Sequence, residues 1–150
     1  MSEFEKAKFI AIKYIGISKK TTFEVKTKLS KYNYSNTIIQ KVINYLIELN
    51  YINDKEYVKL FIKQNINMEK YSVFEIKQKL KQKGIDVKIY AEEFNILDDI
   101  GYNTTVYNKL FDIKIKNTDE LKVKQYLYRR GFVIGEWIKW HYIIVQKKEI

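Results

Sequence analysis

The stretch TTFEVKTKLSKYNY at Thr21–Tyr34 has two further copies in the chain. YSVFEIKQKLKQKGI at Tyr71–Ile85 and DELKVKQYLYRRGF at Asp119–Phe132 repeat its order of an apolar residue, a lysine and a leucine. The nine shared positions are Val25, Lys26 and Leu29, then Ile76, Lys77 and Leu80, then Val123, Lys124 and Leu127. The leucines are 51 and 47 residues apart (80 − 29 and 127 − 80). A regular period of this length predicts stacked copies of one supersecondary unit.

The signals around the first copy predict three helices. Apolar residues at three- and four-residue spacing before Gly16 indicate an amphipathic lead helix. Thr21 and Glu24 have the spacing of a capping box, which opens a short helix. Ser35 or Asn36 can cap a longer closing helix. The inner face of that helix is expected to comprise Ile38, Ile39, Val42, Ile43 and Leu46.

The second copy follows the same order. Asp54 is expected to cap the lead helix, and Ser72 with Glu75 repeats the capping box of the short helix. Gly84 tolerates the left-handed conformation that stops a helix, and Asp86 is expected to open the closing helix. The expected inner faces are Tyr57, Val58, Phe61 and Ile62 in the lead helix, and Ile89, Tyr90, Phe94 and Leu97 in the closing helix.

The third copy is less regular. Its lead helix is expected over Thr104–Lys114, and Asp119 and Gly131 mark the start and the stop of its short helix. Lys122 stands where the capping box has a glutamate, as expected of a terminal repeat without a neighbour on one side. The expected inner residues are Val106, Leu110 and Ile113 of the lead helix, and Trp137, Trp140, Tyr142 and Ile144 of a closing helix.

These signals predict an all-α protein. The sequence has no proline, and its five glycines fall near the expected ends of helices. We expect an elongated, curved array of three tandem three-helix repeats, with boundaries at residues 1–50, 51–100 and 101–150. The repeats should form one continuous array, because no linker or low-complexity segment separates them.

Residues for catalysis or metal binding are scarce. The absence of cysteine excludes disulfides, thiol catalysis and thiolate metal sites. The single histidine, His141, lies among aromatic and apolar residues, and no phosphate-binding glycine loop is present. The adjacent carboxylates of Glu92 with Glu93 and of Asp98 with Asp99 would point apart on a helix. We therefore expect no enzymatic activity, no cofactor and no metal.

The apolar segments are too short or too interrupted for a membrane role. Charged residues interrupt the first sixteen residues, so they do not form the apolar core of a signal peptide. The longest apolar run, Tyr142–Val145, is far too short to span a bilayer. The sequence therefore predicts a cytoplasmic protein without membrane contacts.

The net charge of +10 favours polyanionic partners, above all nucleic acid. Lysine, isoleucine, asparagine and tyrosine are all abundant, so a compositional bias of the genome is the alternative origin of this charge. The positions of the basic residues bear on the choice between a binding role and a compositional bias. The basic residues in and beside the short helices lie off the apolar face. These candidate binding residues are Lys19, Lys20, Lys26, Lys28, Lys77, Lys79, Lys81, Lys83, Lys124, Arg129 and Arg130.

Four segments in order resemble the RecX family. Lys19–Val25 resembles that family's R-x-R-S-x-x-E-L pattern, and Asn50–Val58 is similar to G-Y-(L/I)-(N/D)-D-x-x-(F/Y)-A. Gly84 and Ile85 resemble the end of L-x-x-K-G-(I/V), and Tyr126–Phe132 resembles Y-L-x-(R/K)-(R/K)-G-F. Lysines at 19 and 20 replace arginines of the family pattern, and an asparagine at 50 replaces a glycine.

The resemblance implies a modulator of the RecA recombinase built from three tandem three-helix repeats. Such a protein binds RecA filaments on single-stranded DNA and inhibits strand exchange, ATP hydrolysis and co-protease activity in recombination and the SOS response. The basic residues would contact RecA and single- or double-stranded DNA, and the protein would act as a monomer. The alternatives are a stand-alone DNA-binding protein of tandem helix-turn-helix-like units and a helical scaffold unrelated to DNA.

Overall fold

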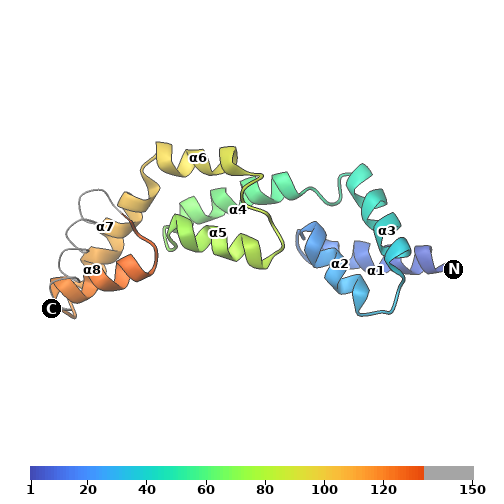
Figure 1. Cartoon of the computed structure of the whole chain (residues 1–150), viewed down its shortest axis with the longest axis horizontal. Helices are drawn as coiled ribbons and strands as arrows, with labels where there is room; N and C mark the ends of the chain where they lie inside the picture. Colours follow the sequence, from blue (N-terminus) through green and yellow to red (C-terminus); the bar gives the residue numbers. More distant parts are fainter. Residues whose placement is uncertain (134–150) are drawn as a thin grey trace. The chain divides into compact units, whose positions relative to one another are not determined.

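The computed structural model describes residues 1–133, which form eight α-helices joined by turns (Figure 1). Within these residues there is no strand, and no helix has the length and apolar character needed to cross a membrane. The all-helical prediction is confirmed. The helices are α1 (Glu3–Ile17), α2 (Thr22–Ser30), α3 (Asn36–Glu48), α4 (Asp54–Met68), α5 (Val73–Gln82), α6 (Ala91–Asp99), α7 (Tyr102–Lys114) and α8 (Glu120–Arg129).

Helices α1–α3 lie in the first predicted repeat, α4–α6 in the second, and α7 and α8 in the third. The closing helix expected around Trp137–Ile144, with His141, lies outside the described residues. The chain divides into two compact units, Met1–Phe61 with Lys79–Tyr90 and Ile62–Gln78 with the residues from Ala91 onward. The repeat boundaries at 1–50, 51–100 and 101–150 stay a prediction.

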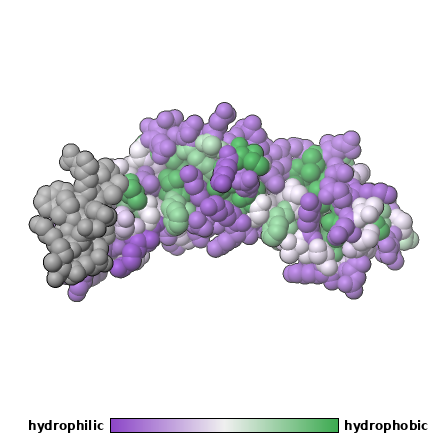
Figure 2. All heavy atoms as spheres, in the orientation of Figure 1, coloured by the Kyte–Doolittle hydropathy of each residue, from purple (hydrophilic) through white to green (hydrophobic). Residues whose placement is uncertain are grey.

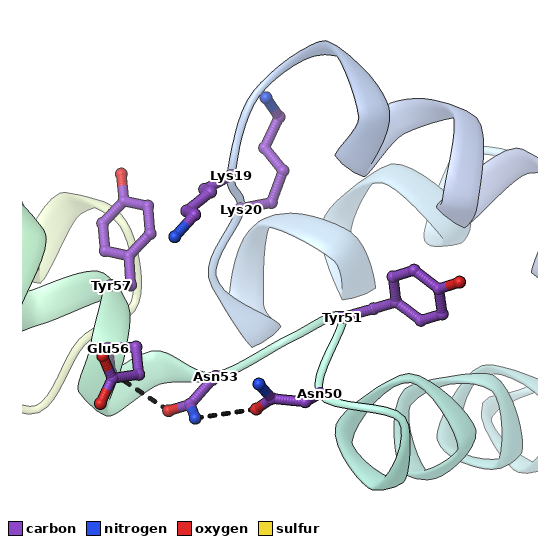
Figure 3. A pocket seen from close by; sticks show the side chains of 7 residues that line it. All are labelled: Lys19, Lys20, Asn50, Tyr51, Asn53, Glu56 and Tyr57. Atoms are coloured by element: carbon purple, nitrogen blue, oxygen red, sulfur yellow. Dashed lines mark hydrogen bonds between the residues drawn. The ribbon is translucent and has the colours of Figure 1, made fainter.

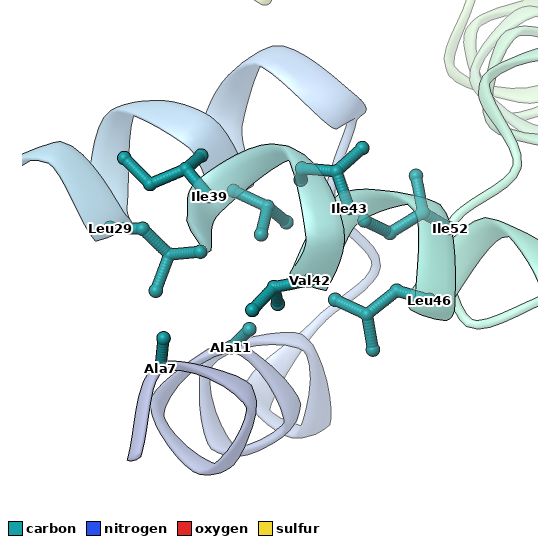
Figure 4. Close-up of a cluster of buried hydrophobic side chains, with 9 residues drawn as sticks. Ala7, Ala11, Leu29, Ile39, Val42, Ile43, Leu46 and Ile52 are labelled. Carbon is teal, nitrogen blue, oxygen red and sulfur yellow. The ribbon is translucent and has the colours of Figure 1, made fainter. Parts of the chain in front are cut away.

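The first repeat packs its three helices around one apolar cluster (Figure 4). Ala7 and Ala11 of α1 are fully buried and point toward Val42 and Leu46 of α3. Alanines at this contact let the two helix backbones approach closely. The buried members of the cluster are Ala7, Ala11, Val25, Leu29, Ile39, Val42, Ile43, Leu46 and Ile52.

Both predicted capping boxes are present. In α2, Thr21 N–H donates to Glu24 Oε1 (3.0 Å) and Glu24 N–H donates to Thr21 Oγ1 (3.2 Å). In α5, Ser72 and Glu75 make the same pair of bonds at 3.0 and 3.1 Å. Of the two cap candidates for α3, Ser35 is the cap, because its hydroxyl accepts the Ile38 N–H at 3.2 Å.

Two expected helix starts in the second repeat are wrong. Asn53 caps α4 by accepting the Glu56 N–H at 3.1 Å, and Asp54 is the first helical residue. Helix α6 begins only at Ala91, because residues 87–90 form turns after Asp86. Ile89, expected on the inner face, is therefore 72% exposed.

The third repeat also departs from the expectation at two places. Helix α7 begins at Tyr102, two residues earlier than expected, and Ile113 near its end is exposed. Tyr102 is buried, and its hydroxyl donates to the backbone carbonyls of Asn65 and Tyr71. Both expected ends of the short helix are confirmed, since Asp119 accepts the Lys122 N–H at 2.9 Å and caps α8, and Gly131 follows α8 with a φ of +92°.

Candidate interaction surface at the repeat joints

The start of a short helix contacts the turn that follows the next short helix, and we call this contact a joint. In the first joint the Thr21 hydroxyl donates to the Lys83 carbonyl at 2.7 Å. Phe23 lies directly over Gly84, where a Cβ would come within 2.1 Å of the Phe23 Cβ. Gly84 also has a φ of +77°, so the turn needs glycine for two separate reasons.

Two carboxylates complete the first joint. Asp54 Oδ1 accepts from the backbone N–H of Thr22 at 2.9 Å and from its hydroxyl at 3.2 Å. Glu24 lies 3.7 Å from the Lys83 ammonium. Burial lowers the pKa of Lys83, but its hydrogen bond with Tyr57 and its interactions with Glu24 outweigh that effect and raise the pKa overall. Every residue of this joint belongs to the first compact unit.

The second joint lies within the second compact unit and repeats the chemistry of the first. The Ser72 hydroxyl donates to the Arg130 carbonyl at 2.5 Å, and Asn103 Oδ1 accepts the Val73 N–H at 3.0 Å. Phe74 lies over Gly131, where a Cβ would come within 2.6 Å of the Phe74 Cβ.

In the second joint Arg130 takes the place that Lys83 has in the first joint, and it makes more contacts than Lys83 does. Its Nη2 lies 2.9 Å from Glu75 Oε1 and donates to the Lys70 carbonyl at 2.7 Å, while its Nε lies 3.2 and 3.3 Å from the two Glu75 oxygens. Burial lowers the pKa of Arg130, and the hydrogen bonds and charge of Glu75 more than offset this and raise the pKa above its ordinary value. The guanidinium is therefore held in one place by several acceptors.

The joints bring together residues from the repeated helix starts and from the turns that follow the short helices. Thr21, Glu24, Asp54 and Gly84, which lie in the segments with the family-like patterns, all meet in the first joint. Sequence reasoning recognised Thr21 and Glu24 as a helix cap but missed the contacts that both make with Lys83. It missed Asp54 and Asn103 as joint residues altogether.

A pocket of about 270 Å³ lies beside the first joint (Figure 3). The Lys19 amine points toward the side of the pocket that holds Asn53 and Tyr57, whereas the Lys20 amine points away from it. The Lys20 amine instead bonds to Ser18 and lies 4.7 Å from the centre of the Tyr14 ring. The pocket is lined by Lys19, Lys20, Asn50, Tyr51, Asn53, Glu56 and Tyr57.

The structure places the candidate basic residues in three settings. Lys19, Lys81 and Arg129 are exposed, whereas the side chains of Lys83 and Arg130 lie in the joints. The others are half-buried; among them Lys124 pairs with Glu120 at 2.7 Å and Lys77 lies 5.2 Å from the centre of the Phe94 ring. The half-buried residues are Lys20, Lys26, Lys28, Lys77, Lys79 and Lys124.

These residues fall into two groups. The first compact unit holds the candidates from Lys19 to Lys28 and those from Lys79 to Lys83, and the second holds Lys77, Lys124, Arg129 and Arg130. Their role in binding stays a prediction. Among residues 1–133, no three or more histidine, cysteine, aspartate or glutamate side chains gather in an arrangement that could hold a metal ion.

Comparisons with known proteins point to one family. The family described as "RecX, second three-helix domain" matches residues 53–92. The "Regulatory protein RecX" of Streptococcus uberis is 40% identical over 97 residues, which are 65% of this chain and 38% of that protein. The protein of the same name from Lactococcus lactis subsp. lactis is 36% identical over 145 residues, which are 87% of this chain and 52% of that protein.

Solved structures agree with these matches. The crystal structure of RecX from Lactobacillus salivarius superposes with a TM-score of 0.72 at 27% identity, over 98% of this chain and 97% of that chain. A second crystal structure, of a regulatory protein RecX, shares the fold with a TM-score of 0.71 at 22% identity.

The chain spans about half the length of most of the curated relatives it matches. Its match to the Lactococcus protein, for example, covers 52% of that protein.

Proposed function

The chain belongs to the RecX family, and from this premise we propose that it regulates the RecA recombinase by binding RecA filaments on single-stranded DNA. Binding inhibits strand exchange, ATP hydrolysis and co-protease activity during recombination and SOS repair. The protein acts as a cytoplasmic monomer and has no catalytic activity of its own.

The observation that carries this proposal is the repetition of a basic surface. The short helices α2, α5 and α8 each carry lysines beside a buried apolar face, and their leucines recur after 51 and 47 residues. A filament presents the same protein surface once per protomer, so a partner with repeated surfaces can bind several protomers. The net charge of +10 adds long-range attraction toward the DNA phosphates.

The proposed contacts exclude Lys83 and Arg130, because each pairs within a joint with the capping-box glutamate of the preceding short helix. Lys124 is kept, because its partner Glu120 belongs to its own helix. Lysine ammonium groups bind phosphates and carboxylates as point charges, without the forked geometry of arginine. Binding should therefore weaken strongly as the salt concentration rises. The proposed contact residues are Lys19, Lys20, Lys26, Lys28, Lys77, Lys79, Lys81, Lys124 and Arg129.

The direct test reverses charge on one short helix. The variant K77E/K79E/K81E should inhibit the DNA-dependent ATPase of RecA less than the unchanged chain does, and a circular dichroism spectrum should show the same helix content. The matched control K41E/K63E/K116E removes the same charge from exposed lysines outside the short helices. It should inhibit like the unchanged chain. Equal losses in the two variants would assign binding to overall charge and contradict the proposed surface.

The alternative functions give different results in the same assay. A stand-alone DNA-binding protein of tandem helix-turn-helix-like units would bind duplex DNA sequence-specifically and leave the RecA ATPase unchanged. A scaffold unrelated to DNA would bind neither single strands nor duplexes in a salt-dependent way. Titration of both DNA forms without RecA, beside the ATPase measurement, separates the three functions.

A further inference from the structure

An apolar groove lies on the first repeat, on the surface of α1 and the end of α2. Its volume is about 310 Å³, and its apolar lining comes from Phe9, Ile10, Ile17 and Tyr32. Phe9 is 62% exposed and Ile17 is 80% exposed. Figure 2 shows some hydrophobic side chains among the hydrophilic ones on the surface of the first repeat. Contiguous exposed apolar surface of this kind is typical of a binding site.

Two lysines flank this apolar surface. Lys13 is exposed and Lys28 is half-buried, and both line the groove. Neither pairs with a carboxylate within the part of the chain that the structure describes. Glu24, one helical turn before Lys28, is instead bonded to the Thr21 N–H and lies beside Lys83. The groove thus combines an apolar floor with two uncompensated positive charges.

The lining fits amino-acid side chains better than nucleic-acid bases. Bases bind to open aromatic faces, but the ring of Tyr14 already has the amines of Lys20 and Lys28 at 4.7 and 5.3 Å from its centre. Lys28 lies 5.9 Å from the Tyr32 ring as well. Ile10 and Ile17 offer branched aliphatic surface, against which aliphatic and aromatic side chains pack.

We propose that this groove binds a short acidic segment of a partner protein. An aliphatic or aromatic side chain of the segment lies between Phe9, Ile17 and Tyr32, and carboxylates on either side of it pair with Lys13 and Lys28. The charge of the groove selects against basic segments, and its apolar floor selects against purely acidic ones. This inference does not depend on the function proposed above.

The test uses the full chain and the fluorescein-labelled hexapeptide DDIFDD in an anisotropy titration. We expect saturable binding, and no binding of the matched peptide DDSSDD or of a labelled hexamer of deoxythymidine. Phe9→Ala and Lys13→Glu should each weaken binding by about tenfold, as for central residues of an interface. Ile17→Ser provides a second, independent test of the apolar floor, because this side chain is 80% exposed and its loss leaves the core intact.

The matched controls lie on α3, outside the groove. Ile47→Ser removes an apolar side chain that is 49% exposed, and Lys41→Glu reverses an exposed charge. Both variants should bind DDIFDD like the unchanged chain. The proposal is overturned if DDIFDD does not bind, if the control variants weaken binding as much as the groove variants, or if the thymidine hexamer binds and Phe9→Ala abolishes that binding.

Discussion

The guanidinium of Arg130 and the carboxylate of Glu75 face each other in the second joint, with three N···O distances of 2.9, 3.2 and 3.3 Å. At the equivalent place in the first joint, Lys83 and Glu24 make a single contact of 3.7 Å. The two joints therefore share one pattern but differ in the strength of their ion pair. Arginine forms a planar fork that matches a carboxylate, whereas lysine offers a point charge on a flexible stem.

Removing the carboxylate charge should distinguish the two joints. Glu75→Gln should lower the free energy of unfolding by about 1–3 kcal/mol, because it leaves a partly buried guanidinium without its counter-ion. Glu24→Gln should cost less than about 1 kcal/mol, since its partner is more exposed and more distant. Urea denaturation followed by circular dichroism measures both. Glu48→Gln, at an exposed position of α3, serves as the control, and equal costs at Glu24 and Glu75 would contradict the difference between the joints.

The glycines of the joints should resist substitution. Gly84→Ala and Gly131→Ala place a Cβ within 2.1 and 2.6 Å of a phenylalanine Cβ and strain a backbone with positive φ. Each should cost about 1–3 kcal/mol of stability or more. Gly16→Ala is the control, because no atom lies within 4 Å of its added Cβ and α1 should gain stability.

The contact between Gly84 and Phe23 can be isolated with a double-mutant cycle. Gly84→Ala should cost less in a Phe23→Gly background, because the Phe23 Cβ and ring that the added Cβ would meet are both gone and only the backbone strain is left. Thermal denaturation of the four proteins measures the coupling. A coupling of zero would mean that the clash relaxes without cost.

The effects of Asn53→Ala and Asp54→Ala on stability should differ in whether they depend on Thr22. Asn53→Ala should cost about 1 kcal/mol through the lost cap of α4, with no dependence on Thr22. Asp54→Ala should cost about 1–3 kcal/mol, because it removes the acceptor of the Thr22 N–H and hydroxyl. A cycle with Thr22→Val, read by urea denaturation, should show coupling with Asp54→Ala alone. Coupling with Asn53→Ala instead would reverse this assignment of the two residues.

Tyr102 should make stability depend on alkaline pH. Burial is the main cause that raises its pKa from 10.0 to about 12, so the unfolded chain loses this proton first. The resulting contribution to stability is present below pH 10 and is lost as the pH rises through 12. Tyr102→Phe should cost about 1–2 kcal/mol at pH 7 through its lost hydrogen bonds, and this cost should shrink between pH 10 and pH 12.

Urea denaturation of the tyrosine and phenylalanine proteins at several pH values gives this difference directly. The other tyrosines ionise in both proteins, so their effects cancel in the comparison. A cost that stays constant up to pH 12 would mean that Tyr102 has an ordinary pKa in the folded chain.

Local signals of the sequence predicted much of the fold. The capping boxes and the glycine stops depend on residues within a few positions of one another, and the structure contains them. The choice between Asn53 and Asp54 as the cap was not predictable in this way. Both residue types cap helices, and the decision depends on Thr22, 32 positions away. The predicted start of α6 was wrong for a related reason, because Asp86 caps a turn as readily as a helix.

The basic residues show the same limit of local sequence signals, which do not report contacts between distant residues. The spacing of the lysines correctly placed them off the buried face of the short helices. It could not separate the side chains that lie in the joints from those that face solvent. Lys83 and Arg130 pair with glutamates 59 and 55 positions earlier in the chain (83 − 24 and 130 − 75), beyond any helical period.

The capping-box glutamate of each short helix in the first two repeats also pairs with a cationic side chain from the next repeat. A mutation that removes this carboxylate therefore damages a helix start and a joint together, so natural selection on either one preserves both. The cationic side chain follows the end of its helix and carries only one of these two tasks. Evolutionary drift should accordingly be tolerated at the cation, as the exchange between Lys83 and Arg130 illustrates, and be rare at Glu24 and Glu75.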